Sequence, residues 1–216
     1  RILALPIIPG EGVKYDWGIT SYYGLEPSDI LFSRPAVSKT VRYDHADNKY
    51  MEIYDAFVQG ENIDQLLSEA NVEYLILHNE LSPKYSNASS SAEVKATLAK
   101  YQSIKFLKSA GELDIYKNTN FLPNSFISLN NKTSYSYRKI DSGHYIVDIV
   151  DAKKPFELTF KTTFSPLWEA KIGEDIQEHR IVYNYANGWT INQTGSYTID
   201  LIFKVWPNLF SGTHLV

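Results

Sequence analysis

The stretch from Phe160 to Trp206 constrains the fold most, because its apolar and polar side chains alternate with the two-residue period of a β-strand. Near its end, every second residue is large and apolar: Tyr197, Ile199, Leu201 and Phe203. Asn187-Gly188 and Thr194-Gly195 are expected to supply the positive φ angles that tight turns between strands require. The pattern predicts the closing hairpins of an antiparallel β-sandwich.

Composition narrows the function classes. The chain has 216 residues, enough for one large domain or two small ones, and no Cys, which excludes disulfides, thiolate metal sites and Cys nucleophiles. The net charge is −4, and the charged residues do not form a run of one sign along the sequence. Nothing therefore indicates a nucleic acid or an acidic lipid surface as partner. Aromatic residues are abundant, with 16 Tyr, which suits sheet surfaces and also surfaces that bind sugars.

Residues 1–120 are expected to form a small α/β layer. The expected elements are a buried strand at Ile2–Leu5, a helix at Lys49–Val58, a helix capped by Asn62, a strand at Val72–Leu77, a helix with a capping box from Ser90 and Glu93, and a hairpin at 104–107 and 113–116. Residues 8–40 are expected to be one long loop, apart from a short helix that begins at Ser28 or Asp29.

Helical periodicity ends after Asn118, and strand-like segments then recur at the spacing of a sandwich. We expect eight strands, near 125–129, 133–140, 144–150, 155–163, 167–172, 180–185, 189–192 and 196–205. The prediction is therefore an α+β protein with an α/β domain at 1–120 and a jelly-roll-like antiparallel sandwich at 121–216.

Two groups of aromatic residues are candidate binding sites for sugar rings. Trp168 and Trp189 could form a stacking platform, which exposed Tyr183 and Tyr185 would extend; the alternative is that both indoles are core residues of facing strands.

The second group lies in the N-terminal loop from Gly10 to Gly24, where a carboxylate is close in sequence to three aromatic residues. Such a combination is typical of sites that bind sugar hydroxyls. Its members are Asp16, Trp17, Tyr22 and Tyr23. The alternative there is a loop that covers the α/β layer with buried aromatics.

Other polar clusters are weaker candidates. Asp44, His45 and Asp47 resemble a metal site but lack a calcium-loop glycine or a second His at helical spacing. The acidic stretch from Glu174 to His179 offers paired carboxylates for glycoside hydrolysis, but it is expected to be a solvated hairpin loop. No phosphate-binding loop, dinucleotide fingerprint or nucleophile elbow occurs. We therefore predict no catalytic residue, no metal and no cofactor.

The chain resembles the extracytoplasmic domain of polytopic membrane proteins related to lipid-linked-sugar glycosyltransferases. The segments that carry the resemblance are Arg1–Pro6, Ser21–Gly24, Leu66–Ile76, Leu113–Asn118 with Leu122-Pro123, Phe164–Lys171 with Gly173, Tyr185–Trp189, and Trp206-Pro207.

The resemblance implies an accessory domain at the extracytoplasmic face of the cell membrane. In such proteins the catalytic carboxylate lies in the transmembrane bundle, so no residue of this sequence is assigned a catalytic role. The implied partners are the transmembrane part of the parent chain and a cell-envelope glycan or lipid-linked sugar. The start at Arg1 without Met and the apolar tail fit an excised domain. A purely structural interaction module and a free-standing carbohydrate-active enzyme remain the alternatives.

Overall fold

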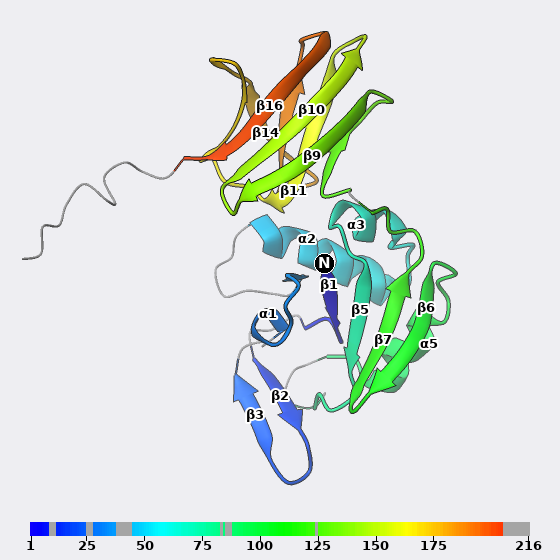
Figure 1. Ribbon diagram of the computed structural model, residues 1–216. Coiled ribbons are helices and arrows are strands. Elements are labelled where there is room, and N and C mark those ends of the chain that lie inside the picture. The colour runs from blue at the N-terminus through cyan, green and yellow to red at the C-terminus, as the bar shows by residue number, and fades with distance from the viewer. Residues whose placement is uncertain are drawn as a thin grey trace, which may run out of the picture. The chain divides into compact units, whose positions relative to one another are not determined.

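A computed structural model of the chain describes residues 1–8, 12–24, 28–37, 45–82, 84, 88–123 and 125–204 (Figure 1). The chain divides into two compact units, one from Arg1 to Ser125 and one from Phe126 onward. The sequence places this division between residues 120 and 121. The α+β class predicted from the sequence is confirmed.

The first unit is built on a five-stranded mixed sheet with the order β4-β1-β5-β7-β6. Its strands are β1 (Ile2–Leu5), β4 (Ala36–Val37), β5 (Tyr74–His78), β6 (Ile104–Ala110) and β7 (Leu113–Asn118). β1 pairs in parallel with both β4 and β5, and β7 runs antiparallel to β5 and β6. The predicted strands and the 104–116 hairpin are thus present.

Helices α2 (His45–Gln59), α3 (Asp64–Glu69) and α5 (Ser91–Leu98) contribute to one apolar core with this sheet. Neighbouring β1 and β5 supply Leu3 opposite Leu75 and Leu5 opposite Leu77, all four fully buried. The capping box that opens α5 is confirmed, with Ser90 and Glu93 bonded reciprocally. The predicted cap of α3 is wrong by one residue. Buried Ile63 is the N-cap, and Asn62 Oδ1 accepts a hydrogen bond from the Asp64 amide at 2.8 Å.

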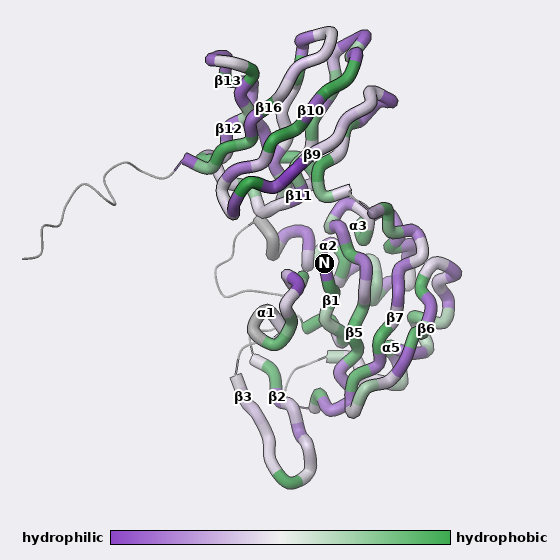
Figure 2. Tube along the Cα trace, in the orientation of Figure 1, coloured by the Kyte–Doolittle hydropathy of each residue, from purple (hydrophilic) through white to green (hydrophobic). Residues whose placement is uncertain are grey.

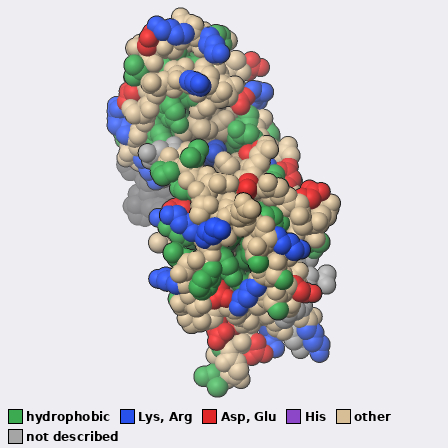
Figure 3. Space-filling model, turned by 90° about the vertical axis from the view of Figure 1, so that its right-hand side faces the viewer, with side chains coloured by type: hydrophobic (Ala, Val, Ile, Leu, Met, Phe, Trp, Pro, Cys, Tyr) green, Lys and Arg blue, Asp and Glu red, His purple; other side chains and the backbone are tan. Residues whose placement is uncertain are grey.

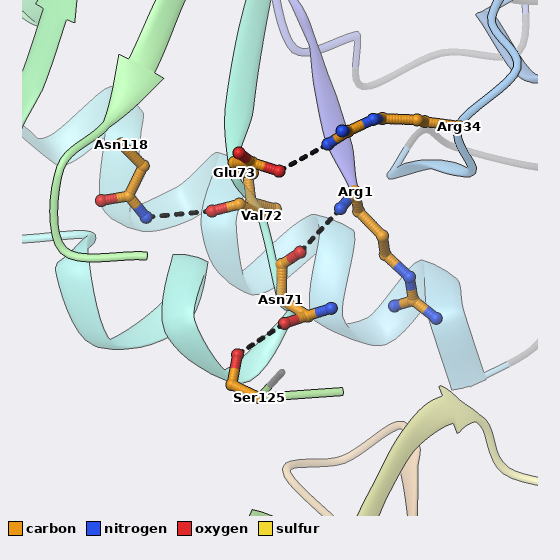
Figure 4. A network of polar contacts seen from close by, with 7 residues as sticks. All are labelled: Arg1, Arg34, Asn71, Val72, Glu73, Asn118 and Ser125. Carbon is orange, nitrogen blue, oxygen red and sulfur yellow. Dashed lines mark hydrogen bonds and ion pairs between the residues drawn. The ribbon is translucent and has the colours of Figure 1, made fainter. Parts of the chain in front are cut away.

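A polar network closes the end of the sheet at which β1 and β5 begin (Figure 4). Its centre is Asn71, whose φ of 57° places it in the left-handed region. The Asn71 carbonyl accepts from the Arg1 backbone nitrogen at 2.9 Å, and its Oδ1 accepts from the Ser125 hydroxyl at 2.8 Å. Two further contacts complete the network, Arg34 with Glu73 at 2.5 Å and Asn118 Nδ2 with the Val72 carbonyl at 3.0 Å. The segment that leaves the first unit is therefore held to the start of β5.

The prediction of one long loop over residues 8–40 is wrong. The described part of this region holds a hairpin of β2 (Val13–Asp16) and β3 (Ser21–Gly24), followed by α1 (Ser28–Leu31) and β4. The short helix at Ser28 is confirmed. Strands of four residues are too short for the two-residue alternation to stand out in a sequence, which is why the hairpin was missed.

The second unit is an antiparallel β-sandwich, as predicted. Its strands are β8 (Ile127–Leu129), β9 (Ser134–Asp141), β10 (His144–Ala152), β11 (Phe156–Thr163), β12 (Trp168–Ile172), β13 (Asp175–Ile176), β14 (Glu178–Val182), β15 (Ala186–Ile191) and β16 (Gly195–Phe203). One sheet has the order β13-β12-β16-β10-β9 and the other β14-β15-β11-β8. The nine strands exceed the predicted eight because the acidic stretch after Gly173 forms β13. From residue 125 to 204, all of them described, the chain contains no helix.

Residues from both sheets form one buried core, which includes Val147, Leu158 and Leu201. Figure 2 shows the contrast between central β10, which is largely hydrophobic, and edge strand β9, which is largely hydrophilic. This contrast follows from position, because β10 pairs on both sides with β16 and β9.

The turn expected at Asn187-Gly188 lies elsewhere. Both residues are inside β15, and the hairpin turn is formed by Tyr183 and Asn184, whose φ angles are 54° and 62°. The Tyr185 amide donates to the Val182 carbonyl at 3.2 Å and closes the turn. Consecutive positive φ angles are typical of a type I′ turn, which matches the twist of the flanking strands. The expectation for Gly195 is confirmed by its φ of 94°.

Candidate functional site

The candidate site is the hairpin β2–β3, which extends away from the sheet of the first unit (Figure 1). Its strands pair with Tyr15 opposite Tyr22 and Asp16 opposite Ser21. Because side chains alternate between faces, Tyr15, Trp17 and Tyr22 share one face. Lys14, Asp16 and Tyr23 occupy the other. The four residues grouped by the sequence prediction therefore divide into Trp17 with Tyr22, and Asp16 with Tyr23.

The first face carries a group of three aromatic rings. The Tyr15 ring lies 6.2 Å from that of Trp17, nearly parallel to it at 10°, and 6.2 Å from that of Tyr22 at 32°. Tyr15 is only 2% exposed, whereas Trp17 is 46% and Tyr22 37% exposed. A buried ring thus supports two accessible rings, so this face offers aromatic area to solvent on a fixed base.

Gly24 makes room for one of these rings. A Cβ added there would lie 2.6 Å from the Tyr22 hydroxyl oxygen, closer than non-bonded atoms approach. The glycine at this position therefore allows the Tyr22 side chain to lie along its own strand.

The second face is polar. Lys14 Nζ lies 3.6 Å from an Asp16 carboxylate oxygen, and the other Asp16 oxygen accepts from the Gly18 amide at 3.0 Å. Tyr23 is exposed on this face, with its hydroxyl end over Gly12. Asp16 therefore supports the turn and is charge-paired, while keeping access to solvent.

Strand β2 is bonded, up to the residue before the turn, to the segment that follows β5. The Asp16 amide donates to the Glu80 carbonyl at 2.9 Å, and the Ser82 amide donates to the Lys14 carbonyl at 2.8 Å. The Tyr15 ring lies 5.0 Å from the ring of His78, the last residue of β5. These contacts fix the aromatic face relative to the sheet.

His78 and Glu80 form a buried polar pair beneath Tyr15. His78 Nδ1 lies 2.9 Å from Glu80 Oε1, and both side chains are more than nine-tenths buried. Within the described part of the chain, His78 Nε2 and Glu80 Oε2 have no hydrogen-bond partner. The sequence prediction missed this pair. The sequence contained a signal for it, because His78-Asn-Glu80 comes directly after the strand predicted at Val72–Leu77. Polar side chains at the carboxyl ends of parallel strands often contact ligands.

The aromatic residues predicted as a platform on the sandwich are mostly buried. Trp168 packs edge-on against Phe160 at 4.8 Å, and Trp189 is fully buried and stacks with the His179 ring at 4.7 Å. Tyr185 is also buried, so only Tyr183 of that group is exposed. The alternative stated for the two indoles, core residues of the sandwich, is what the structure shows, because large aromatic rings stabilise a core by the area they bury.

The remaining polar clusters provide no assembled site. Glu174 is exposed in the turn before β13, Asp175 on β13 and Glu178 on β14, so most of the expected loop is strand. Asp44 and the side chains of His45 and Asp47 lie outside the described residues. Elsewhere in the described ranges, no group of three or more His, Cys, Asp or Glu side chains is placed to hold a metal ion.

The comparisons with known proteins add no family. No family model, no curated protein and no solved structure matches the chain. Among the helices that the structure describes, none combines the length and the apolar character needed to cross a membrane.

Proposed function

We propose that this chain is a non-catalytic, extracytoplasmic domain of a membrane glycosyltransferase-like protein, and that the β2–β3 hairpin binds glycan. The observation that carries the binding proposal is the pair of accessible rings, Trp17 and Tyr22, on the buried ring of Tyr15. The glycan would be a cell-envelope sugar or the sugar of a lipid-linked carrier, the substrate class that the resemblance implies.

Sugar rings complement such a surface. Each pyranose has an apolar face of C–H groups surrounded by hydroxyls, so it stacks on an aromatic ring while its hydroxyls bond to nearby polar groups. On the aromatic face the rings provide both kinds of group, since Trp17 carries an indole N–H and Tyr22 a hydroxyl, whereas Asp16 and Ser21 lie on the opposite face of the hairpin. By analogy with bases stacked on aromatic side chains, each ring contributes about 1–3 kcal/mol, so single-site binding is expected to be weak.

The membrane setting rests on the resemblance. In the structure, its segments fall on elements that shape both units: Arg1–Pro6 on β1, Ser21–Gly24 on β3, Leu66–Ile76 on α3 and β5, and Tyr185–Trp189 on β15. In this proposal the catalytic groups belong to the transmembrane part of the parent chain, and the domain engages the glycan or positions that part.

A purely structural module is the second candidate. It is favoured by the burial of Trp168, Tyr185 and Trp189, which leaves the sandwich without a stacking surface at these positions. Under this proposal the hairpin aromatics only cover Tyr15 and the His78–Glu80 pair.

A calorimetric titration distinguishes the two candidates, because its signal does not depend on the indole that Trp17→Ala removes. Envelope oligosaccharides are added to the parent chain and to Trp17→Ala, Tyr22→Ala and Tyr183→Ala, with circular dichroism to check that each variant is folded. We expect a saturable response in the parent that is lost in the two hairpin variants. Tyr183, an exposed tyrosine in the sandwich, is the matched control and should retain the response. If the parent does not respond, the structural module is the better proposal, and if all variants respond equally, the hairpin is excluded as the binding site.

A further inference from the structure

The tip of the β2–β3 hairpin has a surface that glycan binding does not explain. Ile19, at the turn, is 99% exposed, so its entire side chain stands in solvent. Trp17, at the start of the same turn, is also exposed, and so is Tyr23, which lies further from the turn, opposite Lys14. In Figure 3, which keeps the vertical axis of Figure 1, hydrophobic atoms stand at the end of this hairpin. From Trp17 to Gly24 the chain contains no charged residue.

The backbone of the tip is already hydrogen-bonded internally. The Trp17 amide donates to the Thr20 carbonyl at 3.0 Å, the Gly18 amide to Asp16 Oδ1 at 3.0 Å, and the Ile19 amide to the Trp17 carbonyl at 2.9 Å. Three consecutive donors therefore need no water. The internal bonding of these amides favours insertion into a membrane, because transfer of an unpaired amide into a medium that cannot hydrogen-bond costs free energy.

We propose that this tip inserts into the interfacial region of a lipid bilayer, with Ile19 deepest and the rings of Trp17 and, further along the hairpin, Tyr23 at the level of the lipid headgroups. Trp and Tyr prefer that level because their rings are apolar while their N–H and O–H groups remain hydrated. The surface suits a zwitterionic rather than an anionic bilayer, because residues 17–24 carry no charge, the carboxylate bonded to the Gly18 amide is that of Asp16, and the chain is acidic overall.

Size argues against a protein as the occupant. Stable protein–protein interfaces involve about 20–30 residues on each side, whereas this surface offers only the exposed side chains of Ile19, Trp17 and Tyr23. A shallow insertion about 5–10 Å deep is within the reach of such a tip. The insertion rests on Ile19 and the bonded turn, so it does not depend on sugar binding by Trp17 and Tyr22.

Vesicle flotation with the full chain tests the proposal, using sugar-free vesicles of phosphatidylcholine alone and of phosphatidylcholine with phosphatidylglycerol in equal parts. We expect binding to both compositions, little change on adding salt, and at least a tenfold loss in Ile19→Asp. Ile140→Asp is the matched control, because Ile140 is an exposed isoleucine on β9, and it should float like the parent. Ile19→Asp should still respond to oligosaccharide, so a failure of the membrane proposal can be told apart from a failure of the glycan proposal.

Depth is tested by brominated lipids, which quench a tryptophan that lies within the bilayer. Trp206 lies outside the described residues, so the test is made in a Trp206→Phe background. Quenching should be strong in that background and largely lost when Trp17→Phe is added, since Trp168 and Trp189 are buried in the sandwich. No flotation, flotation only with phosphatidylglycerol, or equal flotation of Ile19→Asp would overturn the proposal. A concentration-dependent dimer that Ile19→Asp abolishes in sedimentation equilibrium would also overturn it and would identify a second copy as the occupant.

Discussion

The side chain of Asn187 accepts a hydrogen bond from Nε2 of His179 at 3.1 Å and holds the imidazole against Trp189. The orientation of the amide is fixed, because Asn187 Nδ2 donates to the carbonyl oxygens of Thr162 at 3.0 Å and Thr163 at 3.3 Å. Oδ1 is therefore the atom that faces the histidine, and Nε2 carries the proton. The half-buried imidazole ring of His179 thus stacks on the fully buried indole of Trp189 and shields it from solvent.

This arrangement predicts a pH-dependent stability. Burial lowers the pKa of His179, and the hydrogen bond to Asn187 opposes this shift only in part. The unfolded chain therefore binds the proton at a higher pH than the folded chain does, near the ordinary value of about 6.5. The contribution of His179 is complete above that pH and declines as the pH falls towards the folded pKa, so the free energy of unfolding should decrease from about pH 8 to about pH 5.

Urea denaturation of the parent and of His179→Gln across this range measures the effect. Glutamine keeps a donor for Asn187 but does not titrate, so the difference between the two proteins isolates His179 from other groups. The difference should change with pH below about 6.5 and level off above it. A difference that is constant over the whole range would contradict the assignment.

A second prediction concerns Gly188. A Cβ there would lie 2.5 Å from Val182 Cγ1 across the β14–β15 pair, so the glycine is required by close packing. Gly188→Ala should lower the free energy of unfolding by about 1–3 kcal/mol, the usual range for overpacking. The measurement is again urea denaturation. Combining Gly188→Ala with Val182→Ala should cost less than the sum of the single changes, and strict additivity would show that the two side chains do not compete for space.

The sandwich was predictable because its strands are long and pair over many residues. Tyr197 to Phe203 alternates regularly, and β16 pairs with β10 along most of that run. Turn positions were less predictable. Asn187-Gly188 has the composition of a type I′ turn, yet Gly188 is needed for Val182, and Tyr183-Asn184 adopts the positive φ angles instead. Composition alone does not say which of two closely spaced Asn-containing pairs forms the turn.

The candidate site was predictable only in part. The sequence marked Asp16, Trp17, Tyr22 and Tyr23, but without a strand register it could not divide them between two faces or show that Tyr15 is the buried base. It also could not tell the exposed Trp17 from the buried Trp168 and Trp189, since burial depends on which strands face each other. The His78–Glu80 pair was missed because its role depends on contact with a hairpin that is far away in sequence.

A third prediction uses this contrast between indoles. Trp189→Ala should lower the free energy of unfolding by about 3–5 kcal/mol, as expected for a large core aromatic. Trp17→Ala should change it by about 0.5 kcal/mol or less, as is usual for surface positions. Chemical denaturation followed by circular dichroism measures both, since it does not depend on the tryptophan that is removed. Comparable losses in the two variants would place Trp17 in a packed environment and remove it as a binding residue.

The last prediction concerns Gly24 and tests the geometry of the aromatic face directly. Gly24→Ala leaves every aromatic residue in place, but its Cβ would lie 2.6 Å from the Tyr22 hydroxyl oxygen and must displace that ring. Since Gly24 does not have a positive φ, the substitution adds no backbone strain of that kind. We therefore expect a folded protein in which Tyr22 has moved away from Tyr15 and the response to oligosaccharide is weakened.

Gly12→Ala is the matched control for Gly24→Ala. An added Cβ at Gly12 would lie 3.5 Å from the Tyr23 hydroxyl, an ordinary contact on the opposite face of the hairpin. If the rings of Trp17 and Tyr22 form the binding surface, only the Gly24 variant loses response in the oligosaccharide titration, by up to the effect of Tyr22→Ala. Chemical shifts of the Tyr22 ring report the displacement independently of any ligand. A shifted ring with an unchanged sugar response would exclude Tyr22 from the site, because its position relative to Tyr15 would then have no bearing on binding.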